Sequence, residues 1–172
     1  ILQRIPPFLG GGEMIDEVYA DHSTWADLPH KFEAGTPAIG EAIGMGAALN
    51  YLKSIGLEEI HTYEKEITEY LFDNLNNING LKILGPSPNI QPERGPLATF
   101  FVKGIHSNDI AELLDNSDIC IRSGHHCCQP LHRHLSLKAT ARASLSFTST
   151  KAEINNFTEE LKSIISFLQK FS

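Results

Sequence analysis

The sequence has few cysteines, and it lacks any long hydrophobic run. Its three cysteines, Cys120, Cys127 and Cys128, lie close together. Neighbouring cysteines rarely bridge each other because the geometry is strained, so no disulfide framework is expected. A reducing compartment is favoured, either the cytoplasm or an organellar stroma. No apolar stretch is long enough to cross a bilayer, and the first residues do not resemble a secretion signal, so we expect no membrane partner.

The sequence also has no excess of basic residues. It contains 14 lysines and arginines against 21 aspartates and glutamates, which gives a net charge of -7. The basic residues are scattered, so nothing would neutralise a phosphate backbone, and a nucleic-acid partner is not expected. The 172 residues suffice for one modest core, or for one domain with part of another. Because there is no initiator methionine, we expect a fragment of a longer protein.

The first third of the chain changes from loop signals to helical periodicity. Glycine and proline recur up to position 37, with a short strand predicted at residues 18–20. Apolar residues then recur at helical spacing, which predicts helices at residues 37–53 and 57–78. Gly80 is a natural stop for the second helix.

The remaining residues alternate between strand and helix patterns. Runs of β-forming residues predict strands, and capping residues mark the starts of helices. The predicted strands are residues 81–84, 97–102, 119–122 and 139–147; the predicted helices are residues 107–115 and a last one after the capping box at residues 150–153. This order predicts an α+β fold, in which helices cover one face of a small, mostly antiparallel sheet.

The segment from Arg122 to His132 contains most of the residues that are capable of chemistry. Cys127 follows two histidines, and a cation and a glycine lie nearby. These surroundings are typical of nucleophilic cysteines. They also fit an ordinary polar loop whose histidines are solvated, and the residues alone leave both interpretations open.

A metal site is a further interpretation of the same segment. His125, His126, Cys127 and Cys128 are all zinc-ligand types. Adjacent residues point in different directions and do not converge easily on one tetrahedral ion, and the usual pair spacings are missing. We therefore expect no metal.

Two other positions are candidates for binding anions. Arg142 lies among small residues, where its guanidinium has room to reach a carboxylate, although a surface ion pair is the commoner role. Gly35 and Thr36 precede a predicted helix, whose N-terminus suits a phosphate. Simple capping by Thr36 explains the same pattern.

Taken in order along the chain, these motifs resemble the class V, fold type I pyridoxal-phosphate enzymes, and among them the type II, SUF-type cysteine desulfurases. The R-x-G-H-H-C loop is the most specific of them, and the resemblance covers essentially the whole chain. The matching segments are Pro6-Pro7 with residues 10–15, then residues 32–37, 122–127 and 142–144.

The resemblance implies a division into domains and a role for each matching residue. Residues 1–52 would end the large cofactor-binding domain, and residues 53–172 would form the C-terminal small domain. Cys127 would accept sulfur and become a persulfide. The implied binding residues are Arg142 for the substrate carboxylate, Arg122 and His126 on the substrate side, and Gly35 and Thr36 for the pyridoxal 5'-phosphate of the partner subunit in a homodimer.

The implied reaction converts L-cysteine to L-alanine and supplies sulfur, through a SUF-type acceptor protein, to iron–sulfur cluster assembly. L-selenocysteine and cysteine sulfinate are alternative substrates of such enzymes. An alternative of another class is a non-enzymatic domain that binds only a sulfur acceptor or a metal.

The sequence departs from the family pattern in two places. The Schiff-base lysine of the family follows a histidine upstream of the Pro6-Pro7 segment, whereas the only His-Lys pair here, His30-Lys31, lies downstream of it. We therefore expect this chain alone not to be a working enzyme. Cys128 stands where the family usually has another residue; it either shares the persulfide or is an inert thiol.

Overall fold

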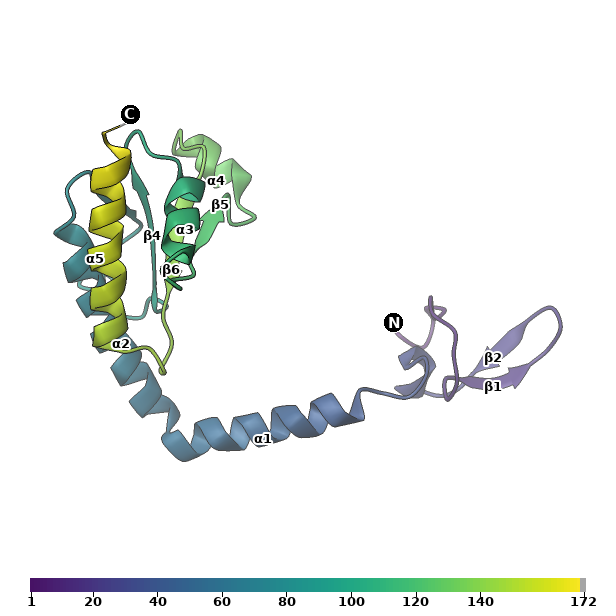
Figure 1. Ribbon diagram of the computed structural model, residues 1–172. Helices are drawn as coiled ribbons and strands as arrows, with labels where there is room; N and C mark the ends of the chain where they lie inside the picture. The colour runs from purple at the N-terminus through teal and green to yellow at the C-terminus, as the bar shows by residue number, and fades with distance from the viewer. Residues whose placement is uncertain (171–172) are drawn as a thin grey trace. The chain divides into compact units, whose positions relative to one another are not determined.

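The computed structural model describes residues 1–170, which form parts of two compact units (Figure 1). The first unit is Ile1–Ile55, and the second begins at Gly56. The assignment of residues 1–52 and 53–172 to two domains of a larger enzyme stays a prediction.

The first unit contains a hairpin, a short 3-10 helix and a long helix. Strand β1 (Ile15–Val18) pairs antiparallel with β2 (Ser23–Trp25), followed by η1 (His30–Phe32) and α1 (Ile39–Ile55). The strand predicted at residues 18–20 is wrong in its position. Tyr19 and Ala20 belong to the turn instead, because the Tyr19 amide donates to the His22 carbonyl at 2.8 Å and closes it.

The second unit is built on a four-stranded antiparallel sheet with the order β3-β4-β6-β5. This arrangement confirms the predicted α+β fold. Its strands are β3 (Leu81–Leu84), β4 (Leu97–Val102), β5 (Arg122–Gly124) and β6 (Thr140–Ser144), and its helices are α2 (Leu57–Asn76), α3 (Ser107–Asp115), α4 (Gln129–His134) and α5 (Lys151–Leu168).

The core lies on one face of this sheet. Alternate residues of β4 are buried, as the pleat of a half-covered strand requires. Helices α2, α3 and α5 supply the opposing apolar residues, and Figure 1 shows α3 and α5 side by side in front of β4 and β6. The most buried members of this core include Leu71, Phe100, Ile110, Ala141 and Leu161. Because helices α2, α3 and α5 cover the core face, side chains on the opposite face of the sheet are not part of this core.

Two helix starts show how local chemistry defines the elements. The predicted capping box of α5 is confirmed: the Glu153 amide donates to Thr150 Oγ1 at 3.2 Å, and the Thr150 amide donates to the Glu153 carboxylate at 2.7 Å. For α3, serine is a common capping residue, so the sequence predicts Ser107 as the cap, and this prediction is wrong. His106 caps this helix, since its Nδ1 accepts from the Asn108 amide at 3.2 Å, and Ser107 is the first helical residue.

The segment before and after β5 also differs from the prediction. The strand predicted at residues 119–122 begins only at Arg122, because the Ile119 amide donates at 3.1 Å to the carbonyl of Leu114 at the end of α3. No helix was predicted between residues 122 and 139, yet residues 129–134 form the short helix α4. Pro130 lies in its first turn, where a missing amide hydrogen costs nothing.

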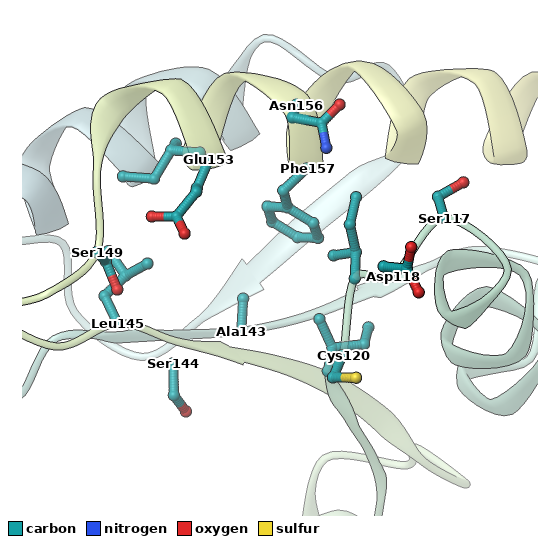
Figure 2. Close-up of a pocket in the computed structure, with 13 residues that line it drawn as sticks. Ser117, Asp118, Cys120, Ala143, Ser144, Leu145, Ser149, Glu153, Asn156 and Phe157 are labelled. Carbon is teal, nitrogen blue, oxygen red and sulfur yellow. The ribbon is translucent and has the colours of Figure 1, made fainter.

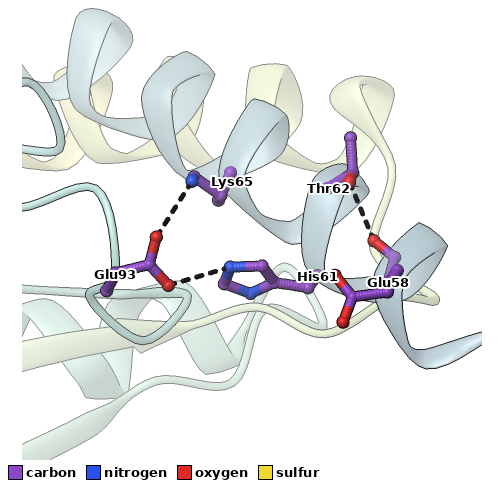
Figure 3. A network of polar contacts seen from close by, with 5 residues as sticks. All are labelled: Glu58, His61, Thr62, Lys65 and Glu93. Atoms are coloured by element: carbon purple, nitrogen blue, oxygen red, sulfur yellow. Dashed lines mark hydrogen bonds and ion pairs between the residues drawn. The ribbon is translucent and has the colours of Figure 1, made fainter.

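An exposed polar cluster joins α2 to the loop before β4 (Figure 3). Lys65 Nζ and His61 Nε2 lie 3.3 Å and 3.2 Å from the two oxygens of the Glu93 carboxylate. Lys65 above all, and His61 after it, lower the pKa of Glu93. Because water and salt screen exposed pairs, we expect this cluster to contribute little to stability.

Candidate functional site

The pairing of β5 with β6 brings two arginines together. Arg122 lies directly opposite Arg142, and Gly124 lies opposite Thr140. Residues that face each other across a ladder project to the same side of the sheet. Since Ala141 and Ala143 of β6 are buried in the core, Arg122 and Arg142 belong to the other face.

The two arginines form a site that suits an anion. Within residues 1–170, neither guanidinium has a carboxylate partner, and Nε of Arg142 is buried without a hydrogen-bond partner. Like charges directly opposite each other destabilise a sheet. A buried donor without an acceptor costs about 1–3 kcal/mol. A bound carboxylate would relieve both costs, and a guanidinium fork matches it in shape.

A tight turn presents Cys127 beside this pair. The Cys128 amide donates to the His125 carbonyl at 2.8 Å, and the two central residues, His126 and Cys127, have φ of 51° and 59°. Positive φ at both central positions is typical of type I′ turns, which glycine and asparagine usually occupy. The Cys127 thiol is exposed, and Nη2 of Arg122 donates to its sulfur over 3.7 Å. The turn therefore places a thiol next to a cation at the edge of the anion site.

His126 is held in one neutral form. Its Nε2 lies 3.1 Å from the Thr140 carbonyl, which can only accept, so Nε2 carries the hydrogen. Burial lowers the pKa of His126, and the charges of Arg142 and Arg122 lower it further against the opposing effect of the Thr140 hydrogen bond. The ring is thus neutral near pH 7. Its Nδ1 is a buried acceptor without a partner in the described part of the chain.

His132 and Thr140 belong to the same network, although neither is predicted as a site residue from the sequence. His132 lies on α4 and is only 6% exposed. Its Nδ1 donates to the Cys128 carbonyl at 3.0 Å, while its Nε2 accepts from the Thr140 hydroxyl at 3.0 Å. Cys128 and His132 are four residues apart, which is about one helical turn. This spacing would indicate a contact between them only if residues 129–134 had been predicted as a helix.

The other two thiols have different surroundings. Cys128 is exposed next to Cys127. Cys120 lies in a cavity of about 400 Å³ that α5, β6 and the segment before β5 line (Figure 2), and its sulfur is 3.7 Å from Asp115 Oδ1. Ala143 and Phe157 line this cavity, so it opens on the core side of the sheet. It contains neither Cys127 nor Arg142.

Gly35 and Thr36 lie in the first unit, just before α1. Gly35 has φ of 87°, and its amide donates to the Gly12 carbonyl at 2.9 Å. This amide is already used, but Thr36 is exposed ahead of a 17-residue helix. Helix α1 begins at Ile39; Pro37 has no amide hydrogen, and the Ile39 amide donates to the Pro37 carbonyl at 2.8 Å. The Thr36 hydroxyl, just ahead of this helix start, would suit one side of a phosphate site. Gly35 contributes the left-handed turn that leads into it.

Two other observations describe residues 1–170. No group of three or more histidine, cysteine, aspartate or glutamate side chains among them is arranged to hold a metal ion. None of the helices in this range combines the length and the apolar character that a bilayer crossing requires.

Comparison with known proteins identifies the family. The sequence model of the class V aminotransferases matches residues 1–157, and the chain belongs to this family. Among its relatives, a probable cysteine desulfurase of Synechocystis sp. is 53% identical over 167 residues, and one of Streptomyces coelicolor is 43% identical over 167 residues. Each alignment covers 97% of this chain but 40% of the relative, so the chain spans about two fifths of the length of these relatives.

Solved structures agree with this assignment. The chain is similar to the cysteine desulfurase CsdA of Escherichia coli, with 29% identity and a TM-score of 0.81 over 94% of this chain and 39% of that one. The chain is also similar to a cysteine desulfurase of Thermococcus onnurineus NA1, with 33% identity and a TM-score of 0.81 over 93% of this chain and 39% of that one. The cystine C-S lyase C-DES, solved with its reaction product cysteine persulfide, is 25% identical, with a TM-score of 0.68 over 94% of this chain and 39% of that one. These likenesses confirm the predicted class V family and the predicted fold.

Proposed function

We propose that this chain carries the sulfur-accepting part of a pyridoxal-phosphate-dependent cysteine desulfurase of the SUF type. In the whole protein, Cys127 would take sulfur from L-cysteine and leave L-alanine. The observation that carries the proposal is the position of the exposed Cys127 thiol, 3.7 Å from Arg122, which lies opposite the incompletely paired Arg142. The relatives' printed names favour the same activity.

The residues divide the reaction between them. Arg142 would bind the substrate carboxylate with its guanidinium, and the neutral His126 would accept a hydrogen bond from the substrate at Nδ1. The Cys127 thiolate attacks the substrate sulfur, so that an S–S bond forms while the Cβ–S bond breaks. The electron pair of the broken bond stays with carbon, which takes up a proton to give alanine. The reaction is balanced without an outside oxidant.

The cofactor would meet this chain at its first unit. Gly35 and Thr36 would hold the phosphate of pyridoxal 5'-phosphate bound to the partner subunit of a homodimer. When bound, this cofactor withdraws electrons from the substrate α-carbon, which is the difficult part of the chemistry. What the chain itself supplies is the orientation of the carboxylate and of the thiol, since reacting atoms must lie in contact before bonds can change.

The product on Cys127 would then leave to another protein. An exposed thiol on a turn is accessible to a second thiol, as persulfide transfer to a SUF-type acceptor requires. We place this transfer in iron–sulfur cluster assembly, in the cytoplasm or an organellar stroma. L-selenocysteine and cysteine sulfinate are the alternative substrates. A comparison of the rates on these two and on L-cysteine decides which substrate the enzyme prefers.

Replacement of each thiol in turn tests the proposal. In the Cys127→Ser variant, alanine release from L-cysteine should fall by about a hundredfold or more, because the sulfur acceptor is lost. Cys120→Ser and Cys128→Ser are the matched controls and should keep most of the activity. The assignment would be refuted if alanine release stayed at the wild-type rate both in Cys127→Ser and in the double variant Cys127→Ser, Cys128→Ser. If only the double variant is inactive, Cys128 shares the role.

A further inference from the structure

A buried histidine joins the segments on both sides of the Cys127 turn. His132 uses both ring nitrogens: Nδ1–H donates to the carbonyl of Cys128, and Nε2 accepts from the hydroxyl of Thr140, each at 3.0 Å. The Thr140 carbonyl in turn accepts from His126 at 3.1 Å. Residues immediately before and immediately after Cys127 are therefore tied to a single residue of β6.

The roles of donor and acceptor follow from the partners. A carbonyl oxygen cannot donate, so the hydrogen lies on Nδ1 of His132 and on Nε2 of His126. In the neutral ring, a hydrogen on Nδ1 of His132 leaves the lone pair at Nε2, which then accepts from the Thr140 hydroxyl. His132 is 6% exposed and Thr140 is fully buried, which keeps water from substituting for either partner.

The turn needs such support because its backbone is unfavourable. Neither His126 nor Cys127 is a glycine, yet both have positive φ. Residues in this region cost on the order of 1 kcal/mol or more each and persist only where the surroundings enforce them. Backbone hydrogen bonds hold this conformation in part: the Cys128 amide donates to the His125 carbonyl, and the His132 amide donates to the Cys128 carbonyl at 3.2 Å. The side chains of His126, His132 and Thr140 add the buried hydrogen bonds described above, and Arg122 contacts the Cys127 sulfur.

We propose that His132 is a positioning residue, which, with Thr140, holds the turn so that the Cys127 sulfur stays beside Arg122. Its importance for catalysis rests on the proposed function, whereas the clamp itself is a property of the turn. Without the clamp the turn relaxes toward ordinary backbone angles, and the thiol spends less time at the arginine pair.

Four variants of the protein test this role. His132→Leu removes both hydrogen bonds and keeps the apolar bulk, while His132→Asn restores a donor near the position of Nδ1. Thr140→Val removes only the hydroxyl, and it tests the same contact if His132→Leu does not fold. His134→Leu, on an exposed position of the same helix, is the matched control.

The kinetic test separates positioning from substrate binding. In His132→Leu and Thr140→Val, kcat for alanine release from L-cysteine should fall between about tenfold and a hundredfold, because small misplacements of reacting groups have effects of this size. KM should change less than about twofold, since Arg142 is untouched. His132→Asn should recover part of kcat, and His134→Leu should match the wild type. A loss of thermal stability with unchanged kcat would overturn the proposal.

Two spectroscopic tests do not depend on activity. Nitrogen NMR should show His132 with the hydrogen on Nδ1 and His126 with the hydrogen on Nε2. Amide exchange at Cys128 should accelerate about tenfold or more in His132→Leu but not in His134→Leu. The opposite tautomer at His132, or unchanged exchange at Cys128, would refute the clamp even in a protein without desulfurase activity. If the tautomers and the exchange agree while wild-type protein releases no alanine, the proposed function fails and the clamp stands.

Discussion

At the scale of single residues, the candidate site depends on an unusual pair of like charges. Arg122 and Arg142 face each other across β5 and β6, and within residues 1–170 no carboxylate neutralises them. An anion bound between or beside the two groups would offset their repulsion. Under the proposed function, the exposed sulfur of Cys127 next to Arg122 would react with the substrate held there.

Removal of the Arg142 charge tests the anion site. We expect Arg142→Gln to raise the KM for L-cysteine by roughly tenfold to a hundredfold, because hydrogen bonds to a charged group contribute about 1.5–3 kcal/mol. Steady-state kinetics of alanine release measures this. Arg133→Gln, at an exposed position on α4, is the control. An unchanged KM in Arg142→Gln would contradict the assigned role.

The lowered pKa of His126 gives a prediction about pH. Its folded value lies below the ordinary 6.5, mainly through burial and then through the charge of Arg142. Between these two values the unfolded chain binds more protons than the folded one, so stability rises with pH. The stabilisation is present above about pH 6.5 and is lost as the pH falls through the folded value.

Two measurements check the behaviour of His126. An NMR titration should place its midpoint below 6.5, and Arg142→Gln should move the midpoint upward because one positive charge is removed. The melting temperature of His126→Asn should fall less on acidification than that of the wild type. A midpoint at or above 6.5 would contradict the electrostatics described for the site.

At the scale of elements, the sequence predicted those whose hydrophobic period and end signals agree. Helix α5 has both an apolar stripe and a capping box, and β4 alternates between buried and partly exposed residues. The prediction of an element was wrong where a tertiary contact overrode the local sequence pattern. Ile119 has strand character, but its amide is bonded to the end of α3, so β5 begins later than predicted.

The capping box gives a prediction for α5. Thr150→Ala should reduce the free energy of unfolding by about 1 kcal/mol, because the Glu153 amide loses its acceptor at the start of the helix. Chemical denaturation measures the change. Thr150→Ser keeps the hydroxyl and should lie close to the wild type. A loss of equal size in both variants would show that the methyl group, and not the hydroxyl, is responsible.

The candidate site was predictable in its residue types but not in its geometry. The motif around Cys127 and the position of Arg142 among small residues indicated a nucleophile and an anion binder. That Arg122 meets Arg142 follows from the register of β5 on β6, which no local pattern encodes. His132 was missed because α4 has only six residues, too few to show a helical period.

At the scale of the whole molecule, the described residues account for part of a catalytic apparatus. The chain spans about two fifths of the length of its curated relatives. Under the proposed function it would supply a carboxylate-binding arginine, an exposed thiol and one side of a phosphate site. The proposed activity therefore belongs to the complete enzyme.

The most direct test locates the transferred sulfur. The complete enzyme, loaded with pyridoxal phosphate, is incubated with sulfur-labelled L-cysteine, digested after thiol blocking, and sequenced by mass spectrometry. We predict that the label lies on Cys127 as a persulfide and that one alanine is released for each label bound. Label on Cys120, or no protein-bound sulfur while alanine forms, would contradict the claim that the Cys127 turn delivers the sulfur acceptor to the arginine pair.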